Sequence, residues 1–567
     1  MRALLPVTAV LLALTATPAQ AGFRDSCERS AGVRVCTGMV ESFDGTPLDA
    51  TLTLPAKVKK GKRLPLVLFL HGFLNDKNEY ISANRKGHDY KTVELNNFWF
   101  ASRGYAVVNY SARGHGASGG EIGLASKHVD TRDAHHVTGL LVDEGIVNRR
   151  RVAAIGGSYG GGQTWLLATV RGKSAPQYGS WRSPKGRIVQ LAAAVPQFTW
   201  TDLLFSLVPN GREPVTPTPL GVSKITLLNG FVASINTKLT DDVRRWLTRV
   251  NEGEPYEPSG GDPVVEEAKK ALTVDRSAYY QDGFFRALRG KRKRQRSIPI
   301  LAAQGWTDPI FPAVEAVRMY SRLRSIRRRY PIQLYFGDFE HLTAQVKIPD
   351  MRYYHRLANT LLDRHLRGKR RRPSFDVRSA PTLCDPQKFG PVVRSSSWAG
   401  LHPDALSIDL KGARTTGSPV MDPRGVAADQ VVVGLQRRGC VTTDLPETPG
   451  VATWRVPVER DFTLVGMPRL ELTYSAVGPD VQLNSRLWDV APDGVQTLVT
   501  RGAYRVVAPP MGEQYVSYQQ YGNHWRFATG HELLLEVTGD DSTFFRRDNF
   551  PSTIAIERAK LTLPGEQ

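Results

Sequence analysis

The chain has 567 residues, of which 41% are hydrophobic and 23% are charged. This length exceeds what one ordinary hydrophobic core holds, so we expect at least two domains. Because apolar and aromatic residues occur throughout, the composition excludes an intrinsically disordered chain. Lys and Arg outnumber Asp and Glu by 75 to 54, which gives a formal net charge of +21.

Much of the positive excess lies in three runs, at residues 291–296, 327–329 and 367–372. Basic runs of this kind make nucleic acid one candidate partner. They lack interleaved aromatic residues and any nucleic-acid motif, so we expect no nucleic-acid binding. The runs favour a solvated surface that is attracted to an anionic cell envelope.

The first 21 residues resemble a secretory signal peptide. Arg2 forms the charged start, residues 4–14 form an apolar core, and Ala19-Gln20-Ala21 is a small-residue cleavage site. The apolar stretch is too short to span a bilayer, and Pro18 breaks it. We predict cleavage after Ala21 and export to the extracellular space or the cell envelope.

The predicted export bears on the state of the four cysteines, because exported proteins form disulfides. These cysteines are Cys27, Cys36, Cys384 and Cys440. An even number in an oxidising compartment predicts two disulfides, and the simplest of the three connectivities pairs Cys27 with Cys36 and Cys384 with Cys440. Four free thiols are the alternative. No C-x-x-C spacing is present, so we expect no zinc site.

Six short, nearly continuous apolar runs alternate with helical or loop segments, at residues 66–70, 105–110, 152–155, 189–195, 300–303 and 332–336. This pattern predicts a parallel sheet covered on both faces by helices. Residues 32–56 alternate in polarity around Asp44-Gly45, which indicates an antiparallel hairpin at the sheet edge. Ligands of such sheets bind at the carboxyl ends of the strands.

Changes in pattern predict the domain boundaries. After the signal peptide, residues 22–195 and 298–370 form the two parts of the α/β domain. Residues 196–297, which include a predicted helix at 240–250, form an inserted helical cap, with a third independent domain as the alternative. Residues 371–567 begin with a basic, Pro-rich linker and continue as short alternating strands, which indicate a β-sandwich or jelly roll.

The sequence Gly156-Gly157-Ser158-Tyr159-Gly160 follows a buried strand and precedes a helical run. In this context G-x-S-x-G forms a nucleophile elbow, in which a strained turn lifts the serine hydroxyl clear of the sheet. The glycines two residues on either side avoid collisions with the strand and the helix. The alternative is a Gly-rich turn with a solvated serine.

Asp308 and His341 each lie just beyond the end of a predicted strand. The chain order Ser158, Asp308, His341 is that of the α/β-hydrolase triads. In this scheme Ser158 attacks an acyl carbon, His341 transfers its proton, and Asp308 orients the imidazole. The first oxyanion donor is then the backbone N–H of Tyr159, and the second is that of Phe73 in the turn after residues 66–70.

Other polar clusters are weaker candidates. Ser118 lies in a Gly/Ser-rich loop with no helix after it, and His71 precedes the nucleophile, so we expect both to be structural. The group around Asp130, Asp133 and His136 lacks a second set of ligands, so we expect no metal. No nucleotide-binding signature is present, and we expect no cofactor.

These motifs resemble the X-prolyl dipeptidyl peptidase and cocaine-esterase-like serine hydrolases. The resemblance rests on residues 156–161, 113–120 and 305–308, and on residues 464–472 and 487–494 in the C-terminal part. It implies an α/β-hydrolase domain, a helical cap and a jelly-roll domain. Several members use a tyrosine side chain as an oxyanion donor where this chain has Phe73. That donor is therefore either absent here or supplied by another residue, for which Tyr80 is the candidate.

We therefore expect a secreted serine hydrolase that releases X-Pro dipeptides or related acyl groups from peptides. The alternative substrates are carboxylic esters or acyl-amides, because the same triad can cleave either kind of bond and the cap sets the substrate specificity. A third hypothesis is a non-catalytic protein whose sandwich binds cell-surface glycans. The sequence leaves the oligomeric state open.

Overall fold

The computed structural model describes residues 23, 27–87, 89, 91–170, 181–211, 220–256, 261–290, 296–339, 341, 347–418, 422–434 and 439–566. The expected signal peptide and its cleavage site at Ala21 lie outside these ranges. Within them, every helix is too short or too polar to cross a bilayer.

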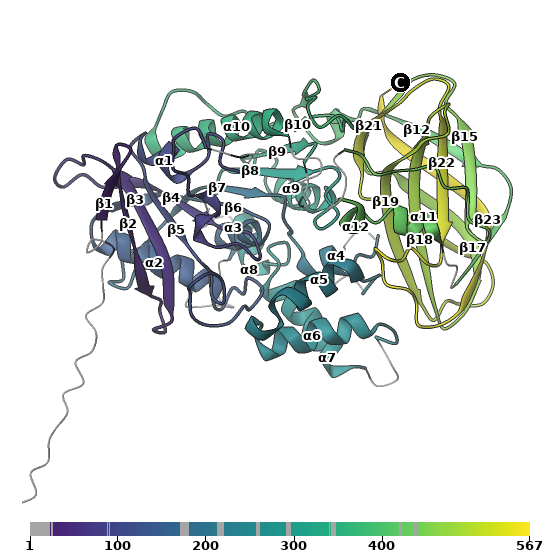
Figure 1. Ribbon diagram of the computed structural model, residues 1–567, viewed down its shortest axis with the longest axis horizontal. Helices are drawn as coiled ribbons and strands as arrows, with labels where there is room; N and C mark the ends of the chain where they lie inside the picture. The colour runs from purple at the N-terminus through teal and green to yellow at the C-terminus, as the bar shows by residue number, and fades with distance from the viewer. Residues whose placement is uncertain are drawn as a thin grey trace, which may run out of the picture.

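A mixed sheet forms the centre of the N-terminal part of the molecule (Figure 1). Its order is β1-β2-β3-β5-β4-β6-β7-β8-β9-β10-β11, with neighbouring strands parallel from β5 to β10 and antiparallel at both edges. The bounds are β1 (Cys27–Ser30), β2 (Val33–Glu41), β3 (Pro47–Pro55), β4 (Leu64–Leu70), β5 (Ala106–Tyr110), β6 (Val147–Gly157), β7 (Leu191–Gln197), β8 (Ile300–Gly305), β9 (Ile332–Gly337), β10 (Val377–Ser379) and β11 (Val393–Ser395). The predicted parallel sheet and edge hairpin are both present.

Helices cover both faces of this sheet, and strand β4 shows why its sequence is continuously apolar. Alternate side chains of a strand point to opposite faces. Leu66 and Leu68 belong to the buried cluster that also contains residues of α2, α3 and α9, whereas Val67 and Phe69 belong to the cluster that contains residues of α1 and α10. The bounds are α1 (Asn97–Ala101), α2 (Asp130–Asp143), α3 (Tyr159–Thr169), α9 (Val314–Ile326) and α10 (Ile348–Arg367).

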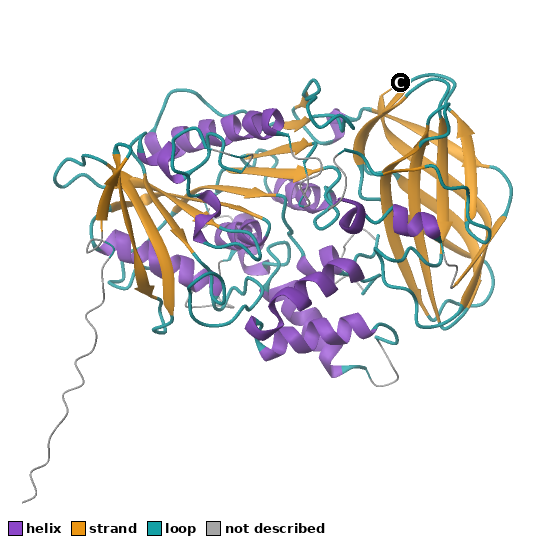
Figure 2. Cartoon of the chain, viewed as in Figure 1, coloured by secondary structure: helices purple, strands orange, loops and turns teal. Residues whose placement is uncertain are grey.

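The connection from β7 to β8 is a helical insertion, most of which lies below the sheet in this view and beside the C-terminal part (Figure 2). Its elements are α4 (Leu203–Leu207), α5 (Ile225–Ile235), η3 (Asn236–Lys238), α6 (Asp241–Glu252), α7 (Pro263–Lys270), η4 (Ala271–Asp275) and α8 (Asp282–Arg289). Helix α6 corresponds to the predicted helix at 240–250, and its N-cap is Thr240, whose hydroxyl accepts the Val243 N–H. The remaining short helical turns are η1 (Lys77–Tyr80) in the N-terminal part and η5 (Ala399–Leu401).

The C-terminal part is a sandwich of antiparallel sheets, as predicted. One sheet contains β12 (Asp404–Leu410), β13 (Arg414–Ser418), β16 (Phe462–Gly466), β17 (Arg469–Val477), β20 (Gln514–Gln519), β21 (Asn523–Phe527) and β23 (Ser552–Glu566). The other contains β14 (Thr442–Thr443), β15 (Ala452–Pro457), β18 (Asp480–Val490), β19 (Gln496–Val507) and β22 (Glu532–Thr538). Short helices α11 (Pro423–Ala427) and α12 (Gln430–Gly434) precede β14.

Both predicted disulfides are present. Cys27 and Cys36 are directly opposite each other on β1 and β2, and their disulfide joins these edge strands. Cys384 and Cys440 join the segment after β10 to the segment before β14. The second bond therefore ties the start of the C-terminal part to its own sandwich.

The sandwich also packs against the helical insertion through arginine contacts. Arg546 donates hydrogen bonds to the carbonyls of Asn251 and Glu252, both at 2.8 Å. Arg505, on β19, forms an ion pair with Glu254 at 3.6 Å and another with Asp480. These contacts hold the end of α6 against the sandwich.

Candidate active site

Ser158 lies at the sharp turn between β6 and α3. Its backbone angles are φ 54° and ψ −120°, a region that non-glycine residues rarely occupy. Hydrogen bonds hold this conformation on both sides. The Ser158 N–H donates to the Gln197 carbonyl at 3.1 Å, and the Ser158 carbonyl accepts the Thr199 hydroxyl at 2.7 Å. The strand–turn–helix context predicted for the elbow is therefore present.

Close backbone contacts explain two glycines of this turn. A Cβ atom on Gly160 would lie 1.9 Å from the Leu70 carbonyl oxygen, and one on Gly156 would lie 2.4 Å from the carbonyl carbon of Gly160. Side chains do not fit at such distances. Helix α3 can therefore begin directly beside β4 only because these positions lack a side chain.

Asp308 and His341 follow neighbouring strands and meet beyond their carboxyl ends. The imidazole Nδ1 lies 2.6 Å from Asp308 Oδ2. Asp308 Oδ1 accepts the backbone N–H groups of Ile310 at 2.9 Å and Phe311 at 3.0 Å. The Asp308 side chain is fully buried and that of His341 is 12% exposed. A carboxylate held in this way favours the tautomer with its proton on Nδ1, which leaves the Nε2 lone pair free to accept a proton.

The other ring nitrogen of His341, Nε2, is buried and has no hydrogen-bond partner among the described residues. The hydrogen bond to Ser158 that the predicted roles require is thus not formed in this structure. The imidazole contacts the rings of Phe198 and Phe311, each at 5.3 Å between centroids, and Phe311 also lines the pocket beside Ser158. Catalytic hydrogen bonds such as the one between Ser158 and His341 are often long or poorly aligned before substrate binds.

The two predicted oxyanion donors border the same pocket as Ser158. The rings of Phe73 and Tyr159 lie 5.7 Å apart between centroids. Tyr159 is the first residue of α3, so its N–H has no acceptor within the helix. The Tyr80 hydroxyl also reaches this turn, because it lies 3.0 Å from the position of a Cβ atom on Gly157.

The Tyr159 hydroxyl has a structural role that the sequence pattern does not reveal. It donates to Asp130 at 3.0 Å and accepts the Ala125 N–H at 2.8 Å. Burial raises the pKa of Asp130 to about 6, and the nearby Asp133 carboxylate contributes to this rise. The tyrosine therefore fixes the loop that contains Leu124, one wall of the pocket.

The weaker candidates lie in structural networks. His71 Nε2 accepts the Ala112 N–H at 2.8 Å, and burial lowers the pKa of His71 to about 4, so this ring is neutral. Ser118 donates to the Ser111 carbonyl at 2.6 Å. Asp133 accepts a hydrogen bond from the Arg113 guanidinium at 2.7 Å.

Two residues outside the predicted site anchor the loop that carries Asp308. Lys224 is buried at the start of α5, and its Nζ donates to the carbonyls of Pro309 at 2.7 Å and Ile310 at 2.8 Å. Gln430, from the C-terminal part, donates to the Thr307 carbonyl at 2.9 Å. No local sequence signal identifies them, because each acts across more than 80 residues of chain.

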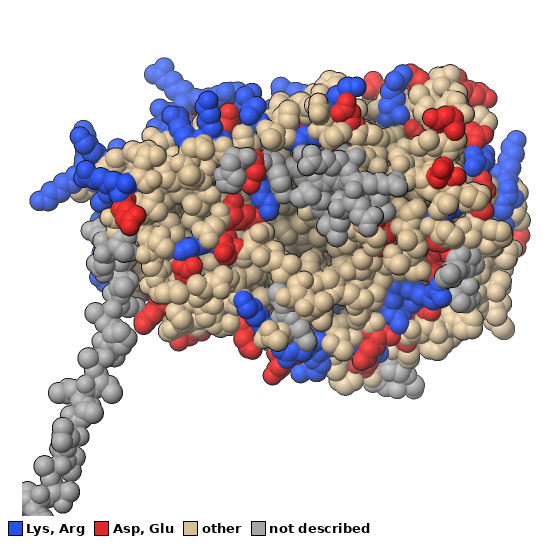
Figure 3. All heavy atoms as spheres, viewed as in Figure 1, with Lys and Arg blue, Asp and Glu red and all other residues tan. Residues whose placement is uncertain are grey.

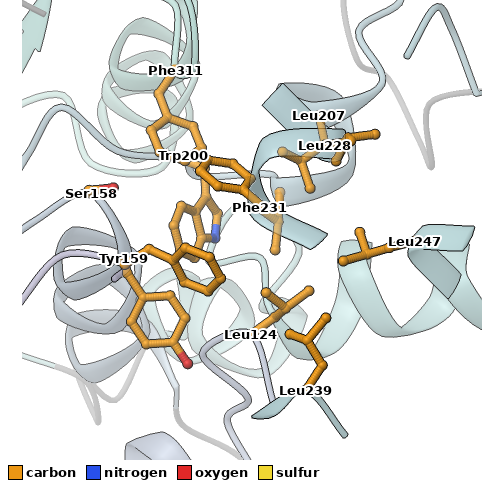
Figure 4. A pocket seen from close by; sticks show the side chains of 12 residues that line it. Leu124, Ser158, Tyr159, Trp200, Leu207, Leu228, Phe231, Leu239, Leu247 and Phe311 are labelled. Carbon is orange, nitrogen blue, oxygen red and sulfur yellow. The ribbon is translucent and has the colours of Figure 1, made fainter. Parts of the chain in front are cut away.

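A small, narrow pocket opens beside Ser158, between the sheet and the helical insertion, with a cavity volume of about 50 Å³ (Figure 4). The insertion supplies much of its wall, including Leu228 and Phe231 from α5 and Leu247 from α6. The polar atom of Trp200 is already bonded, because its Nε1 donates to the Arg276 carbonyl at 2.7 Å. The described residues that line the pocket carry no charge.

Known proteins share this architecture at low sequence identity. An aminopeptidase from the marine sediment archaeon Thaumarchaeota archaeon superposes with a TM-score of 0.60 and 14% identity over 98% of this chain and 99% of that protein. A CocE/NonD family hydrolase from Staphylococcus aureus gives 0.62 and 13% over 94% of each chain. An alpha-amino acid ester hydrolase gives 0.61 and 14% over 99% and 100%. These likenesses show the fold.

Sequence comparison identifies the family. A curated relative, dipeptidyl peptidase family member 6 of Caenorhabditis elegans, is 36% identical over 97 residues, which cover 16% of this chain and 13% of that protein. The profile of the X-Pro dipeptidyl-peptidase C-terminal non-catalytic domain matches residues 378–509. The profile of X-Pro dipeptidyl-peptidase (S15 family) matches residues 44–343, more than half of the chain. The chain therefore belongs to the X-Pro dipeptidyl-peptidase (S15) family of serine-type hydrolases.

Proposed function

We propose that this protein hydrolyses ester or amide bonds through an acyl-enzyme formed on Ser158. Ser158 Oγ attacks the acyl carbon while His341 Nε2 takes its proton and then gives it to the leaving group. Asp308 holds the imidazole and stabilises its charged form, which the 2.6 Å contact with Nδ1 supports. The N–H groups of Tyr159 and Phe73 receive the oxyanion, and water then releases the acyl group.

The uncharged, apolar lining of the pocket beside Ser158 is the observation that supports the proposed substrate class. The Tyr159 hydroxyl is already bonded to Asp130, as is the Trp200 indole to Arg276, so neither offers a free polar group. A substrate ammonium would lose its hydration there without gaining a carboxylate partner from the described lining. We therefore propose that the preferred acyl group is neutral and apolar.

Release of X-Pro dipeptides is the second candidate, and the family match over residues 44–343 favours it. A proline ring is apolar and suits the same pocket. This candidate differs from the first in requiring an anionic group for the free α-amine of the peptide.

An acyl-chain series tests the two candidates. We expect kcat/KM for nitrophenyl esters to rise by at least about tenfold from acetyl to hexanoyl, because each buried methylene adds favourable transfer free energy. Leu247→Phe, which fills the pocket, should abolish this rise and leave acetyl ester hydrolysis unchanged. An X-Pro anilide cleaved orders of magnitude faster than every ester would establish the second candidate instead.

Labelling with a fluorophosphonate tests the nucleophile, since only an activated serine reacts. The wild type should be labelled and Ser158→Ala should not. Ser118→Ala is the matched control, because Ser118 lies in the other Gly/Ser-rich loop and its hydroxyl binds the Ser111 carbonyl. Equal labelling of the wild type and Ser158→Ala would show that another residue is the nucleophile.

A further inference from the structure

Basic residues precede the parallel strands of the central sheet, one strand after another. They lie before or at the start of β4, β6, β7, β8, β9 and β10, in segments 57–63, 149–151, 182–187, 296, 327–329 and 369–372. These segments contain no Asp or Glu. Because the amino ends of adjacent parallel strands meet at the same edge of a sheet, the segments share one face, which we term the amino-edge face. Asp308 and His341 lie beyond the opposite edge.

Hydrogen bonds between the segments show that they are neighbours. Arg149, on β6, donates to the Ile188 carbonyl before β7 at 3.0 Å. Arg324 donates to the Arg328 carbonyl at 2.9 Å and to the Phe375 carbonyl at 3.0 Å, and so joins the segments before β9 and β10. Cations that are more than 300 residues apart in sequence thus lie on one face.

A hollow on this face is surrounded by four arginines. Arg63, Arg149, Arg182 and Arg187 line a hollow of about 430 Å³ that is open to solvent. Among the described residues, the Asp143 carboxylate stands beside it, 3.6 Å from Arg187, and already accepts hydrogen bonds from the neighbouring turn on both oxygens. The hollow therefore has a local excess of positive charge.

The surface view agrees with this arrangement. Lys and Arg side chains gather along the upper left edge and the left end of the molecule, over α10 and the end at which β1, β2 and β3 lie (Figure 3). Helices α3, α5 and α6, which contribute residues to the lining of the pocket beside Ser158, lie nearer the middle of the molecule than this end (Figure 1).

We infer that the amino-edge face docks the protein on an anionic phospholipid bilayer, with a lipid phosphate held in the four-arginine hollow. Guanidinium groups bind phosphate oxygens in pairs, which suits such a hollow. The cations extend over six adjacent strands, roughly 24 Å, which matches a broad surface better than a single polyanionic chain. Docking by this face leaves the pocket beside Ser158 open to substrate.

Vesicle co-sedimentation of the full mature chain tests this inference. We expect binding to phosphatidylcholine vesicles that contain about one-third phosphatidylglycerol, and none to phosphatidylcholine alone. Binding should be lost at about 0.5 M salt, where exposed charges are screened. Replacement of Arg63, Arg149, Arg182 and Arg187 by Gln should lower the partition coefficient by about tenfold or more.

The control variant carries the same change in charge on the sandwich, with Gln replacing the exposed residues Lys411, Arg460, Arg526 and Arg558. It should bind as the wild type does, and both variants should keep wild-type hydrolysis of a soluble ester. If the arginine variant does not fold, Gln at the exposed positions 369–372 replaces it in the same assay.

Three outcomes would overturn the inference. The wild type could bind both kinds of vesicle equally, the control could lose as much binding as the arginine variant, or soluble polyphosphate could bind while vesicles do not. The last outcome would identify a polyanionic chain as the partner. None of these results depends on whether Ser158 is the nucleophile.

Discussion

The surroundings of Asp308 explain how the proposed catalytic base, His341, is held in position. Its carboxylate is fully buried, with one oxygen on two backbone N–H groups and the other on His341 Nδ1. The backbone donors fix the carboxylate, so the imidazole is oriented by a group that cannot rotate away. Lys224 and Gln430 hold the carbonyls of the same loop. Orientation of the proposed base thus depends on three separate parts of the chain.

Replacement of Asp308 by Asn tests this arrangement. We expect kcat for a nitrophenyl ester to fall by roughly 10³–10⁴ with little change in KM, because Asn favours the wrong imidazole tautomer. The Asn carbonyl still accepts the N–H groups of Ile310 and Phe311, so the melting temperature should change little. A decrease in kcat of less than about tenfold would exclude Asp308 as the acid of the triad.

At the scale of elements, the contact between α3 and β4 positions Ser158. The first turn of α3 approaches the end of β4 so closely that the Leu70 carbonyl occupies the space of a side chain on Gly160. The elbow is therefore a consequence of how a helix and a strand pack, and not of the serine alone.

Gly160→Ala should consequently displace α3 and abolish both hydrolysis and fluorophosphonate labelling, with a loss of several kcal/mol in unfolding free energy. Gly230→Ala, in helix α5, is the matched control, because a Cβ atom there meets nothing within 4 Å. It should raise stability by about 0.5–1 kcal/mol, since alanine favours the helix. Thermal denaturation and labelling measure both effects. Wild-type activity in Gly160→Ala would show that the close contact is not needed.

Element prediction succeeded where the periodicity was simple. The apolar runs of β4 to β9 were identifiable because strands buried on both faces are continuously hydrophobic. Helix α10 and strand β23 were not predicted. A basic run follows helix α10 directly, and this run obscured the helical periodicity of the segment. Strand β23 is 15 residues long and pairs along its length with β12, β13, β16 and β17. Such pairing depends on partners that are distant in sequence.

At the scale of the whole molecule, the sandwich and the helical insertion meet in a cluster of buried charges. Arg505 and Arg546 approach Glu254, while Asp480 and Asp548 lie close by. Burial raises the pKa of Asp548 to about 7, and the neighbouring carboxylates of Glu254 and Asp480 add to this effect. Its Oδ2 has no hydrogen-bond partner among the described residues.

This raised pKa predicts a pH dependence of stability. The folded state keeps a proton on Asp548 that the unfolded chain releases at its ordinary pKa of 3.8. The resulting stabilisation is fully present below about pH 4 and is lost as the pH rises through about 7. We expect the melting temperature of the wild type to fall by a few degrees more between pH 5 and pH 8 than that of Asp548→Asn. Parallel curves for the two proteins would contradict the prediction.

Local sequence patterns are enough to predict the strand–turn–helix around Ser158, the order Ser158, Asp308, His341, and the change from an α/β pattern to an all-β pattern. Short-range sterics and periodicity encode these features, so they can be read without the fold. The lining of the pocket, the anchors of the Asp308 loop and the meeting of the basic runs on one face depend on the three-dimensional fold. Each of these brings together segments that are far apart in the chain, and the order and register of parallel strands, which no local pattern specifies, set their positions.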